Sequence, residues 1–257
     1  MSKVYFVGCG PGDPDLITVK AKKLIQNADV VVYSGSLIPS EILKLCKKSK
    51  AYDAAKLVRE EIFELLKKNA KKGKKVVRLH DGDPSIYGAI REQMDNLQEE
   101  KIDSVIIPGV TSFLASAAAL GVQLTLPGVT QTMIISRAEK RTKVPKREKI
   151  SELAKHKATM IFYLSVHLLS DIVKEALAGG YSKSTPVGVV YRASWSDEKI
   201  ITGTLGTITK KVRAQKITRT AIIIIGDVIK PKSYEYSRLY DKTFSHMFRK
   251  GKTSSKN

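Results

Sequence analysis

Three short segments rich in glycine and proline carry the residues best suited to hold a small molecule. They are Gly8–Pro14 (GCGPGDP), His80–Gly88 (HDGDPSIYG) and Pro108–Ser112 (PGVTS). Glycine lets the backbone approach a ligand closely, and proline fixes a turn without offering an N–H group. Each segment lies between a β-branched run and a helix-like run. We therefore expect ligand contacts from backbone groups, with Thr111 or Ser112 at a helix N-terminus.

The spacing within these loops excludes two common nucleotide-binding motifs. A dinucleotide-binding G-x-G-x-x-G would need glycine where Asp13 stands, and the Gly-Lys-Ser/Thr ending of a P-loop is missing. None of the three loops contains a lysine that could neutralise phosphates. One such loop is often only a structural turn, but three at one sheet edge favour a bound ligand. A neutral or cationic cofactor therefore fits better than a nucleoside triphosphate.

Other catalytic chemistries find little support in the sequence. It contains no G-x-S-x-G motif of a serine hydrolase and no His/Cys pair at metal-binding spacing, so we expect no metal site. His80 stands beside Asp81 and near Asp83, which would suit an acid–base or metal cluster. A loop histidine satisfied by backbone groups is the more economical interpretation. The sequence identifies no catalytic base.

Strand-like and helix-like runs alternate through the first half of the chain. The predicted strands are Val4–Val7, Val30–Tyr33, Val76–Leu79 and Ser104–Ile107. The predicted helices are Leu16–Asn27, Glu41–Cys46, Leu57–Ala70, Tyr87–Gln98 and Phe113–Leu120. This alternation predicts a mostly parallel sheet with helices on its faces. The three loops then lie at the carboxyl ends of its strands, where open parallel sheets bind ligands.

A second set of elements follows a linker punctuated by glycine and proline. Its predicted strands are Gln131–Ser136, Thr159–Leu164, Val187–Tyr191, Lys199–Gly203 and Ala221–Ile225, and its predicted helices are Ile150–His156 and His167–Ala178. We expect residues 200–204 to form an antiparallel hairpin with the strand before them. The fold class predicted is α/β, with two α/β domains and mostly parallel sheets. The predicted limits are 1–120 and 129–230, with a linker at 121–128 and a basic, partly disordered tail at 231–257.

Length and composition limit the class of protein. A chain of 257 residues with 42% hydrophobic residues can bury a core, which excludes overall disorder. No apolar run approaches the ~20 residues of a membrane span, and Met1–Gly10 lacks the apolar centre of a secretory signal. Two cysteines, Cys9 and Cys46, do not make a disulfide framework. We expect a reduced, cytoplasmic protein without membrane attachment.

Charge is the strongest compositional feature. The chain has 45 lysine and arginine residues against 25 acidic ones, a net charge of +20. Such an excess suits nucleic acid, an anionic membrane surface or a polyanionic small molecule, or it serves only solubility. Residues 137–149 hold seven basic side chains against two acidic, and residues 230–257 hold eight against two.

On the residues quoted above, the chain resembles the tetrapyrrole (corrin/porphyrin) methyltransferases. The three loops stand in that family's order and spacing, and the resemblance covers about residues 3–230. Five further segments are similar to the branch that methylates C-11 of precorrin-4, or of its cobalt complex, in cobalamin (vitamin B12) biosynthesis: Tyr33–Leu37, Thr130–Thr132, Ser136–Thr142, Leu153–Lys157 and Val190–Lys199. One departure is Asp81, where that branch carries a small neutral residue.

The resemblance implies methyl transfer from S-adenosylmethionine (SAM), giving S-adenosylhomocysteine, in a cleft between two domains of a homodimer. Motif matching assigns cofactor contacts to Pro11, Gly82, Asp83, Ile86, Thr111, Ser112, Leu164, Ala193 and Ala221. The partner implied is a polycarboxylate tetrapyrrole, which a basic enzyme would bind and steer. Arg137 and Arg141 are then the carboxylate ligands, with Asp81 at the mouth of the substrate site. The resemblance implies no nucleic-acid partner.

Other interpretations stay open. Another methylase of the same superfamily would act on uroporphyrinogen III at C-2 and C-7, on the ribose 2′-OH of ribosomal RNA, or on the modified histidine of an elongation factor. A basic RNA-binding module is an alternative of a different class, disfavoured by an aromatic content of only 7%. The run Phe113–Leu120 is apolar nearly all round, which suits either a central buried helix or a homodimer interface.

Overall fold

The computed structural model describes residues 3–140 and 142–252 of the chain. Its contacts divide the protein into two compact units. The first unit is Met1–Ala119 with Val190–Lys199, and the second is Leu120–Val189 with Ile200–Asn257. In the described residues, no helix is long and apolar enough to cross a membrane.

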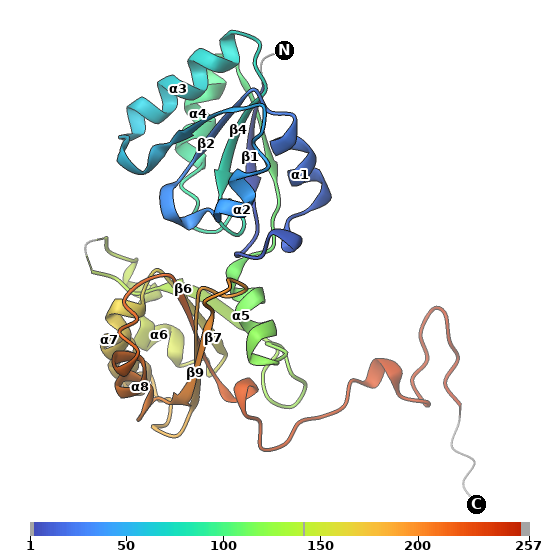
Figure 1. Cartoon of the computed structure of the whole chain (residues 1–257). Coiled ribbons are helices and arrows are strands. Elements are labelled where there is room, and N and C mark those ends of the chain that lie inside the picture. The colour runs from blue at the N-terminus through green and yellow to red at the C-terminus, as the bar shows by residue number, and fades with distance from the viewer. Residues whose placement is uncertain (1–2, 141, 253–257) are drawn as a thin grey trace, which may run out of the picture. The chain divides into compact units, whose positions relative to one another are not determined.

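The first unit is built on a five-stranded parallel sheet (Figure 1). Its strands, in the order β3-β2-β4-β1-β5, are β1 (Lys3–Gly8), β2 (Val30–Tyr33), β3 (Lys50–Asp53), β4 (Val76–His80) and β5 (Asp103–Ile107). All four strand pairs are parallel, and Gly8 at the end of β1 lies opposite His80 at the end of β4. The loops after β1, β4 and β5 therefore leave the same edge of the sheet.

Helices cover both faces of this sheet because its central strands are apolar on both sides (Figure 1). One face packs against α3 (Arg59–Lys71) and α4 (Arg91–Glu99) through Leu66 and Leu97. The other packs against α1 (Val19–Gln26) and α2 (Ser40–Leu43), through buried residues that include Ile25 and Ile42. The helix α5 (Ser112–Leu120) follows the third glycine-rich loop.

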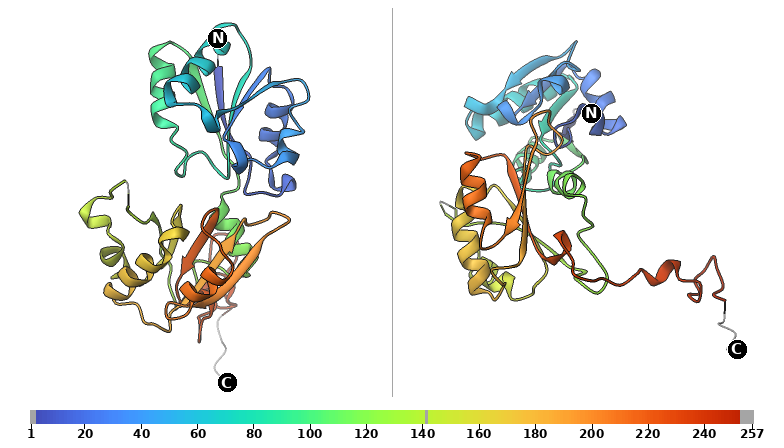
Figure 2. Two further views of the ribbon diagram at one scale, coloured as in Figure 1. Left: turned by 60° about the vertical axis from the view of Figure 1, so that its left-hand side comes forward. Right: turned by 60° about the horizontal axis from the view of Figure 1, so that its bottom comes forward.

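The second unit carries a mixed sheet of five strands in the order β6-β7-β10-β8-β9. Its elements are β6 (Met133–Arg137), α6 (Ile150–Ala154), β7 (Thr159–Tyr163), α7 (Leu169–Ala178), β8 (Pro186–Tyr191), β9 (Lys199–Thr204), α8 (Ile208–Ala214) and β10 (Ala221–Ile225). Strands β6 and β7 are parallel, whereas β7 and β10 are antiparallel. The three helices lie on one side of this sheet (Figure 1, Figure 2).

Local structure departs from the predicted elements at a few points. The helix predicted from Leu16 begins at Val19, because Thr18 accepts a hydrogen bond from the backbone N–H of Ala21 and caps it (3.2 Å). The helix predicted from Tyr87 begins only at Arg91, because Tyr87 and Ala89 have φ angles of 56° and 48°. Strand β3 and helix α8 were not predicted.

Candidate functional site

The first and second glycine-rich loops are joined by backbone hydrogen bonds. The N–H of Cys9 donates to the carbonyl of His80 (2.9 Å). Gly10 and Gly82 exchange two bonds: Gly10 N–H donates to Gly82 O (3.3 Å), and Gly82 N–H donates to Gly10 O (2.8 Å). Both glycines are left-handed, with φ of 85° and 59°. Glycine is the residue that adopts this conformation without strain, so the paired loops require it.

Asp83 joins the second loop to the third. One carboxylate oxygen accepts from the N–H of Ser85 (2.8 Å), which closes a local turn. The other accepts from the N–H of Gly109 (2.9 Å), 26 residues away in the sequence. The residue therefore fixes its own loop and positions the loop that leads into α5.

The three loops pack backbone against backbone. A Cβ atom on Gly109 would lie 2.2 Å from the carbonyl oxygen of Gly82, and one on Gly8 would lie 2.6 Å from the same oxygen. At Gly82 the nearest atoms to a Cβ are the nitrogen of Ser112 and Cα of Thr111, each at 3.5 Å. The start of α5 is thus held beside the second loop. Residues Pro11, Gly82, Asp83, Thr111 and Ser112, predicted from sequence, share this edge of the first unit.

A fourth segment, which we call the strap (Arg192–Glu198), also contacts the first loop. The indole Nε1–H of Trp195 donates to the carbonyl of Pro11 (2.8 Å), and the N–H of Asp13 donates to Ser194 Oγ (3.0 Å). From this segment the sequence predicts a cofactor contact only for Ala193, which is buried. The signal for Trp195 is that it is the chain's single tryptophan, set in a loop after an apolar strand.

The charged residues of the three loops are all acidic: Asp13, Asp81 and Asp83. The exposed Asp81 side chain has a pKa above its usual range, because neighbouring protein groups exclude part of its water. Burial also raises the pKa of the Cys9 thiol to about 12, which keeps it protonated. With no cation in these loops, the edge suits a neutral or positively charged ligand.

His80, at the end of β4, is a buried neutral imidazole. Burial lowers its pKa to about 3, and the nearby Arg78 cation acts in the same direction. Its Nε2 atom has no hydrogen-bond partner among the described residues. Across residues 3–140 and 142–252, no group of three or more His, Cys, Asp or Glu side chains is placed to hold a metal ion.

The buried state of His80 makes stability depend on pH. The folded protein resists protonation of His80 down to pH ~3, whereas the unfolded chain binds that proton near pH ~6.5. The contribution of neutral His80 to the free energy of unfolding is therefore fully present above the unfolded pKa. It falls by up to about 1.4 kcal/mol per pH unit as the pH drops below that value. We expect His80→Gln to flatten the dependence of the urea midpoint on pH between 6.5 and 4.5. Equal slopes for variant and wild type would contradict this assignment.

Arg78, two residues earlier on the same strand, supports the loop after β2. Its guanidinium donates to Ser34 Oγ (2.9 Å) and to the carbonyl of Val32 (3.3 Å). Burial lowers the pKa of Arg78 to about 10, so it remains a cation at neutral pH. The next residue of this loop, Gly35, donates its N–H to the Asp53 carboxylate (2.9 Å). The segment Tyr33–Leu37 is thus anchored from two strands.

Three of the predicted site residues that the structure describes belong to the second unit. Leu164 follows β7 with a φ of 53° and a side chain that is 67% exposed, whereas Ala221 is buried at the start of β10. Arg137 ends β6, and its guanidinium donates to the carbonyls of Thr142 and Lys143 (3.0 Å each). It thus folds the basic loop that follows it. Arg141 lies outside the described residues.

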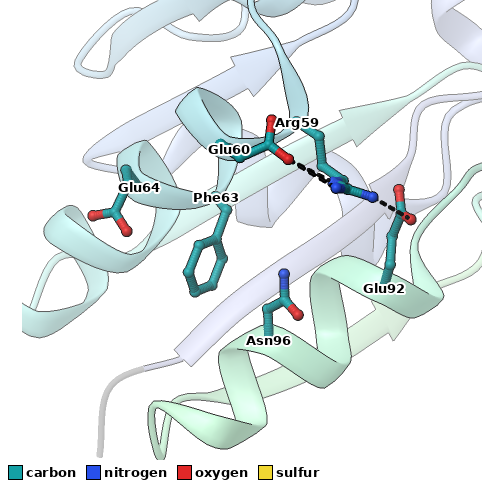
Figure 3. Close-up of a pocket in the computed structure, with 6 residues that line it drawn as sticks. All are labelled: Arg59, Glu60, Phe63, Glu64, Glu92 and Asn96. Atoms are coloured by element: carbon teal, nitrogen blue, oxygen red, sulfur yellow. Dashed lines mark hydrogen bonds and ion pairs between the residues drawn. The ribbon is translucent and has the colours of Figure 1, made fainter.

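A separate pocket lies between α3 and α4 (Figure 3). It is lined by Arg59, Glu60, Phe63, Glu64, Glu92 and Asn96. Arg59 pairs with Glu60 (2.8 Å) and Glu92 (3.6 Å), and Glu64 pairs with Lys67 (2.5 Å). None of the glycine-rich loops contributes to it. Each of its three carboxylates is already paired with Arg59 or Lys67, so it does not compete with the loop edge as the candidate site.

Comparison with known proteins identifies the family. The model of the Tetrapyrrole (Corrin/Porphyrin) Methylases matches residues 3–209, which include all three loops and the strap. The chain belongs to the tetrapyrrole methylase family. A cobalt-precorrin-4 C(11)-methyltransferase from Methanocaldococcus jannaschii is 54% identical over 249 residues, 96% of each chain.

Solved structures of tetrapyrrole methylases share the fold. The X-ray structure of a cobalt precorrin-4 methyltransferase matches with a TM-score of 0.85 and 46% identity, covering 90% of this chain and 97% of that one. A uroporphyrin-III C-methyltransferase from Thermus thermophilus, complexed with S-adenyl homocysteine, matches with a TM-score of 0.76 and 31% identity, covering 89% and 99%. The two-sheet α/β architecture is therefore that of the tetrapyrrole methylases.

Proposed function

We propose that this tetrapyrrole methylase transfers a methyl group from SAM to C-11 of precorrin-4 or of its cobalt complex, in cobalamin biosynthesis. The observation that carries the proposal is the 54% identity, over 96% of both chains, to a cobalt-precorrin-4 C(11)-methyltransferase. Uroporphyrinogen methylation is the alternative within the family. The uroporphyrin-III C-methyltransferase from Thermus thermophilus, solved with S-adenyl homocysteine, is only 31% identical to this chain.

The loop edge of the first unit fits the cofactor. Its glycines at positions 8, 82 and 109 leave no side chain between the loops, and its charged groups are acidic. Pro11, Gly82, Asp83, Ile86, Thr111, Ser112 and Ala193 would hold SAM there, and Leu164 and Ala221 remain proposed contacts. When bound, SAM supplies an electrophilic methyl group on a sulfonium. The Asp83 carboxylate accepts hydrogen bonds from two backbone N–H groups, so its negative charge is already partly compensated within the loops.

The loops of this chain are suited to positioning. In a methyl transfer the positive charge of the sulfonium disperses in the transition state, so a strong counter-charge would stabilise the ground state more and slow the reaction. Rigid backbone loops avoid that penalty and align the reacting atoms. The hydrogen bonds among Gly10, Gly82, Asp83 and Gly109 supply this rigidity.

One experiment tests the proposed reaction directly. The purified protein is incubated with SAM carrying a ¹³C-methyl group and, separately, with precorrin-4, cobalt-precorrin-4, uroporphyrinogen III or ribosomal RNA. We expect methylation of one or both precorrin-4 forms, with the new methyl carbon assigned to C-11 by NMR. Methylation of uroporphyrinogen III or RNA, or no transfer to any acceptor, would contradict the proposal.

Arg137 is proposed as a ligand of the substrate carboxylates. Each charge-assisted hydrogen bond is worth about 1.5–3 kcal/mol, so Arg137→Glu should raise KM for the tetrapyrrole at least about tenfold while SAM affinity changes less than about twofold. Arg141→Glu is the companion variant, and rising salt should weaken substrate capture. Lys183→Glu, at a surface position of the second unit, controls for net charge. Parallel losses for both ligands would argue against this role.

We also propose that the protein is a homodimer. Helix α5 buries Phe113, Ala115, Ser116 and Ala117 but leaves a stripe of Leu114 and Ala118 exposed, and Leu114 is 49% exposed. A two-fold interface would cover that stripe. Sedimentation equilibrium in physiological salt should give about twice 28.4 kDa. A 28.4 kDa species that still binds SAM would contradict the dimer and leave the activity untouched.

A further inference from the structure

The strap fastens the first loop on both sides of Gly12. Trp195 Nε1–H donates to the carbonyl of Pro11 (2.8 Å), and Ser194 Oγ accepts from the N–H of Asp13 (3.0 Å). These partners lie more than 180 residues apart in the sequence. We infer that Trp195 is a positioning residue, which sets SAM affinity by holding the Gly10–Pro14 loop in its binding conformation. This inference rests on the proposed function, since it takes SAM as the ligand of that loop.

The strap is built to hold its tryptophan in one place. The Arg192 guanidinium stacks 3.8 Å from the centre of the indole ring and donates to the Asp197 carboxylate (2.9 Å). The backbone of Trp195 donates to the carbonyl of Arg192 and accepts from the N–H of Glu198 (3.0 Å each). The Glu198 carboxylate in turn accepts from the N–H of Ser194 (2.6 Å). These contacts hold the plane of the indole ring and keep its Nε1–H directed at the Pro11 carbonyl.

Backbone strain in the strap supports a functional role. Arg192 and Ser194 have φ angles of 48° and 68°, in the left-handed region that residues other than glycine rarely adopt. Such conformations persist only where surrounding contacts impose them, and they concentrate at functional sites. One of the two strained residues, Ser194, also accepts the hydrogen bond from the N–H of Asp13 in the first loop.

Gly12 shows how closely the indole approaches the loop. A Cβ atom at this position would lie 2.2 Å from Cδ1 and 2.5 Å from Nε1 of Trp195, and the three nearest atoms all belong to that ring. The φ of Gly12 is outside the left-handed region, so alanine suits its backbone. The obstacle to a side chain at Gly12 is therefore Trp195. This contact makes the two residues a pair that can be tested by a double-mutant cycle.

The test measures SAM affinity by calorimetry for Gly12→Ala, Trp195→Ala and the double variant. We expect Gly12→Ala to raise Kd at least about tenfold in the wild-type background and less than about twofold in the Trp195→Ala background, because the clash has gone. Trp195→Phe keeps a ring but loses the indole donor, so Kd should rise about three- to tenfold, as for one hydrogen bond. The kcat at saturating SAM and KM for the tetrapyrrole should stay within about twofold.

Three outcomes would overturn the inference. They are additive effects of Gly12→Ala and Trp195→Ala on the Kd for SAM, an unchanged Kd for SAM in Trp195→Ala, or equal increases in the KM for SAM and the KM for the tetrapyrrole. Circular dichroism melting identifies any variant that fails to fold, and Trp195→Phe remains informative in that case. SAM binding by the wild-type protein separates a failure of the proposed function from a failure of the role assigned to Trp195. If the wild type binds no SAM, the proposed function fails, whereas normal binding with unaffected variants removes only the role of Trp195. Since Trp195 is the single tryptophan, its fluorescence should also change on SAM binding in the wild type.

Discussion

Gly109→Ala is expected to abolish SAM binding at millimolar concentrations. The new methyl group would lie 2.2 Å from the carbonyl oxygen of Gly82 and 2.9 Å from backbone atoms of Gly8. All of these are main-chain atoms held by hydrogen bonds, so no flexible side chain can yield. The third loop must then move away from the first two. That movement also breaks the bond from Gly109 N–H to the Asp83 carboxylate.

The same substitution should lower the free energy of unfolding by about 2–3 kcal/mol, in the range of overpacked interiors. Urea denaturation measures this loss, and calorimetry on the folded variant measures SAM affinity. Gly206→Ala is the matched control, because its Cβ meets Lys183 O at 3.3 Å and its φ is not left-handed. It should change the free energy of unfolding by less than about 0.5 kcal/mol and leave SAM binding intact. A Gly109→Ala protein that binds SAM within tenfold of wild type would refute the packing argument.

Asp83→Ala is expected to weaken SAM binding at least about 100-fold. Its carboxylate satisfies two N–H groups from different loops, and hydrogen bonds to a charged group contribute about 1.5–3 kcal/mol each. Without it, the second and third loops lose the side chain that connects them. Asp83→Asn should be nearly as harmful, because one oxygen becomes an amide that meets an N–H donor.

Asp13→Asn is the control for this series. Asp13 Oδ1 accepts a bond from Asp15 N–H (2.8 Å) inside an exposed local turn, and asparagine keeps an oxygen for that bond. Its SAM affinity should stay within about twofold of wild type. If Asp83→Asn binds SAM as tightly as Asp13→Asn does, the hydrogen bond from Gly109 N–H to the Asp83 carboxylate does not determine SAM affinity. The comparison separates loss of a negative charge from loss of the connection.

Much of the first unit could be predicted from sequence because its signals are local. The strand Val30–Tyr33 (VVVY) is a continuous apolar run, as expected for a strand buried on both faces. The strand Val76–His80 (VVRLH) is also fully buried, and its apolar residues Val76, Val77 and Leu79 were enough to predict it although Arg78 interrupts them. Strand β3 (KAYD) escaped prediction because it is a short edge strand that is mostly exposed and has only two apolar residues, Ala51 and Tyr52. Helix α8 escaped because its apolar residues are few and its basic ones conceal the pattern. The domain limits and the roles of all the site residues assigned from sequence stay predictions.

The sequence by itself determined the family, the three loops and the residue types within them, since glycine, proline and aspartate act on the backbone nearest to them. Only the tertiary structure decided which atoms meet. It paired Gly10 with Gly82, gave Asp83 its partner at Gly109, and set Trp195 against Gly12. Contacts between segments up to 184 residues apart depend on strand register and sheet order, which no local pattern encodes. For that reason the strap could be read as a motif before its function as a support for the first loop could be inferred.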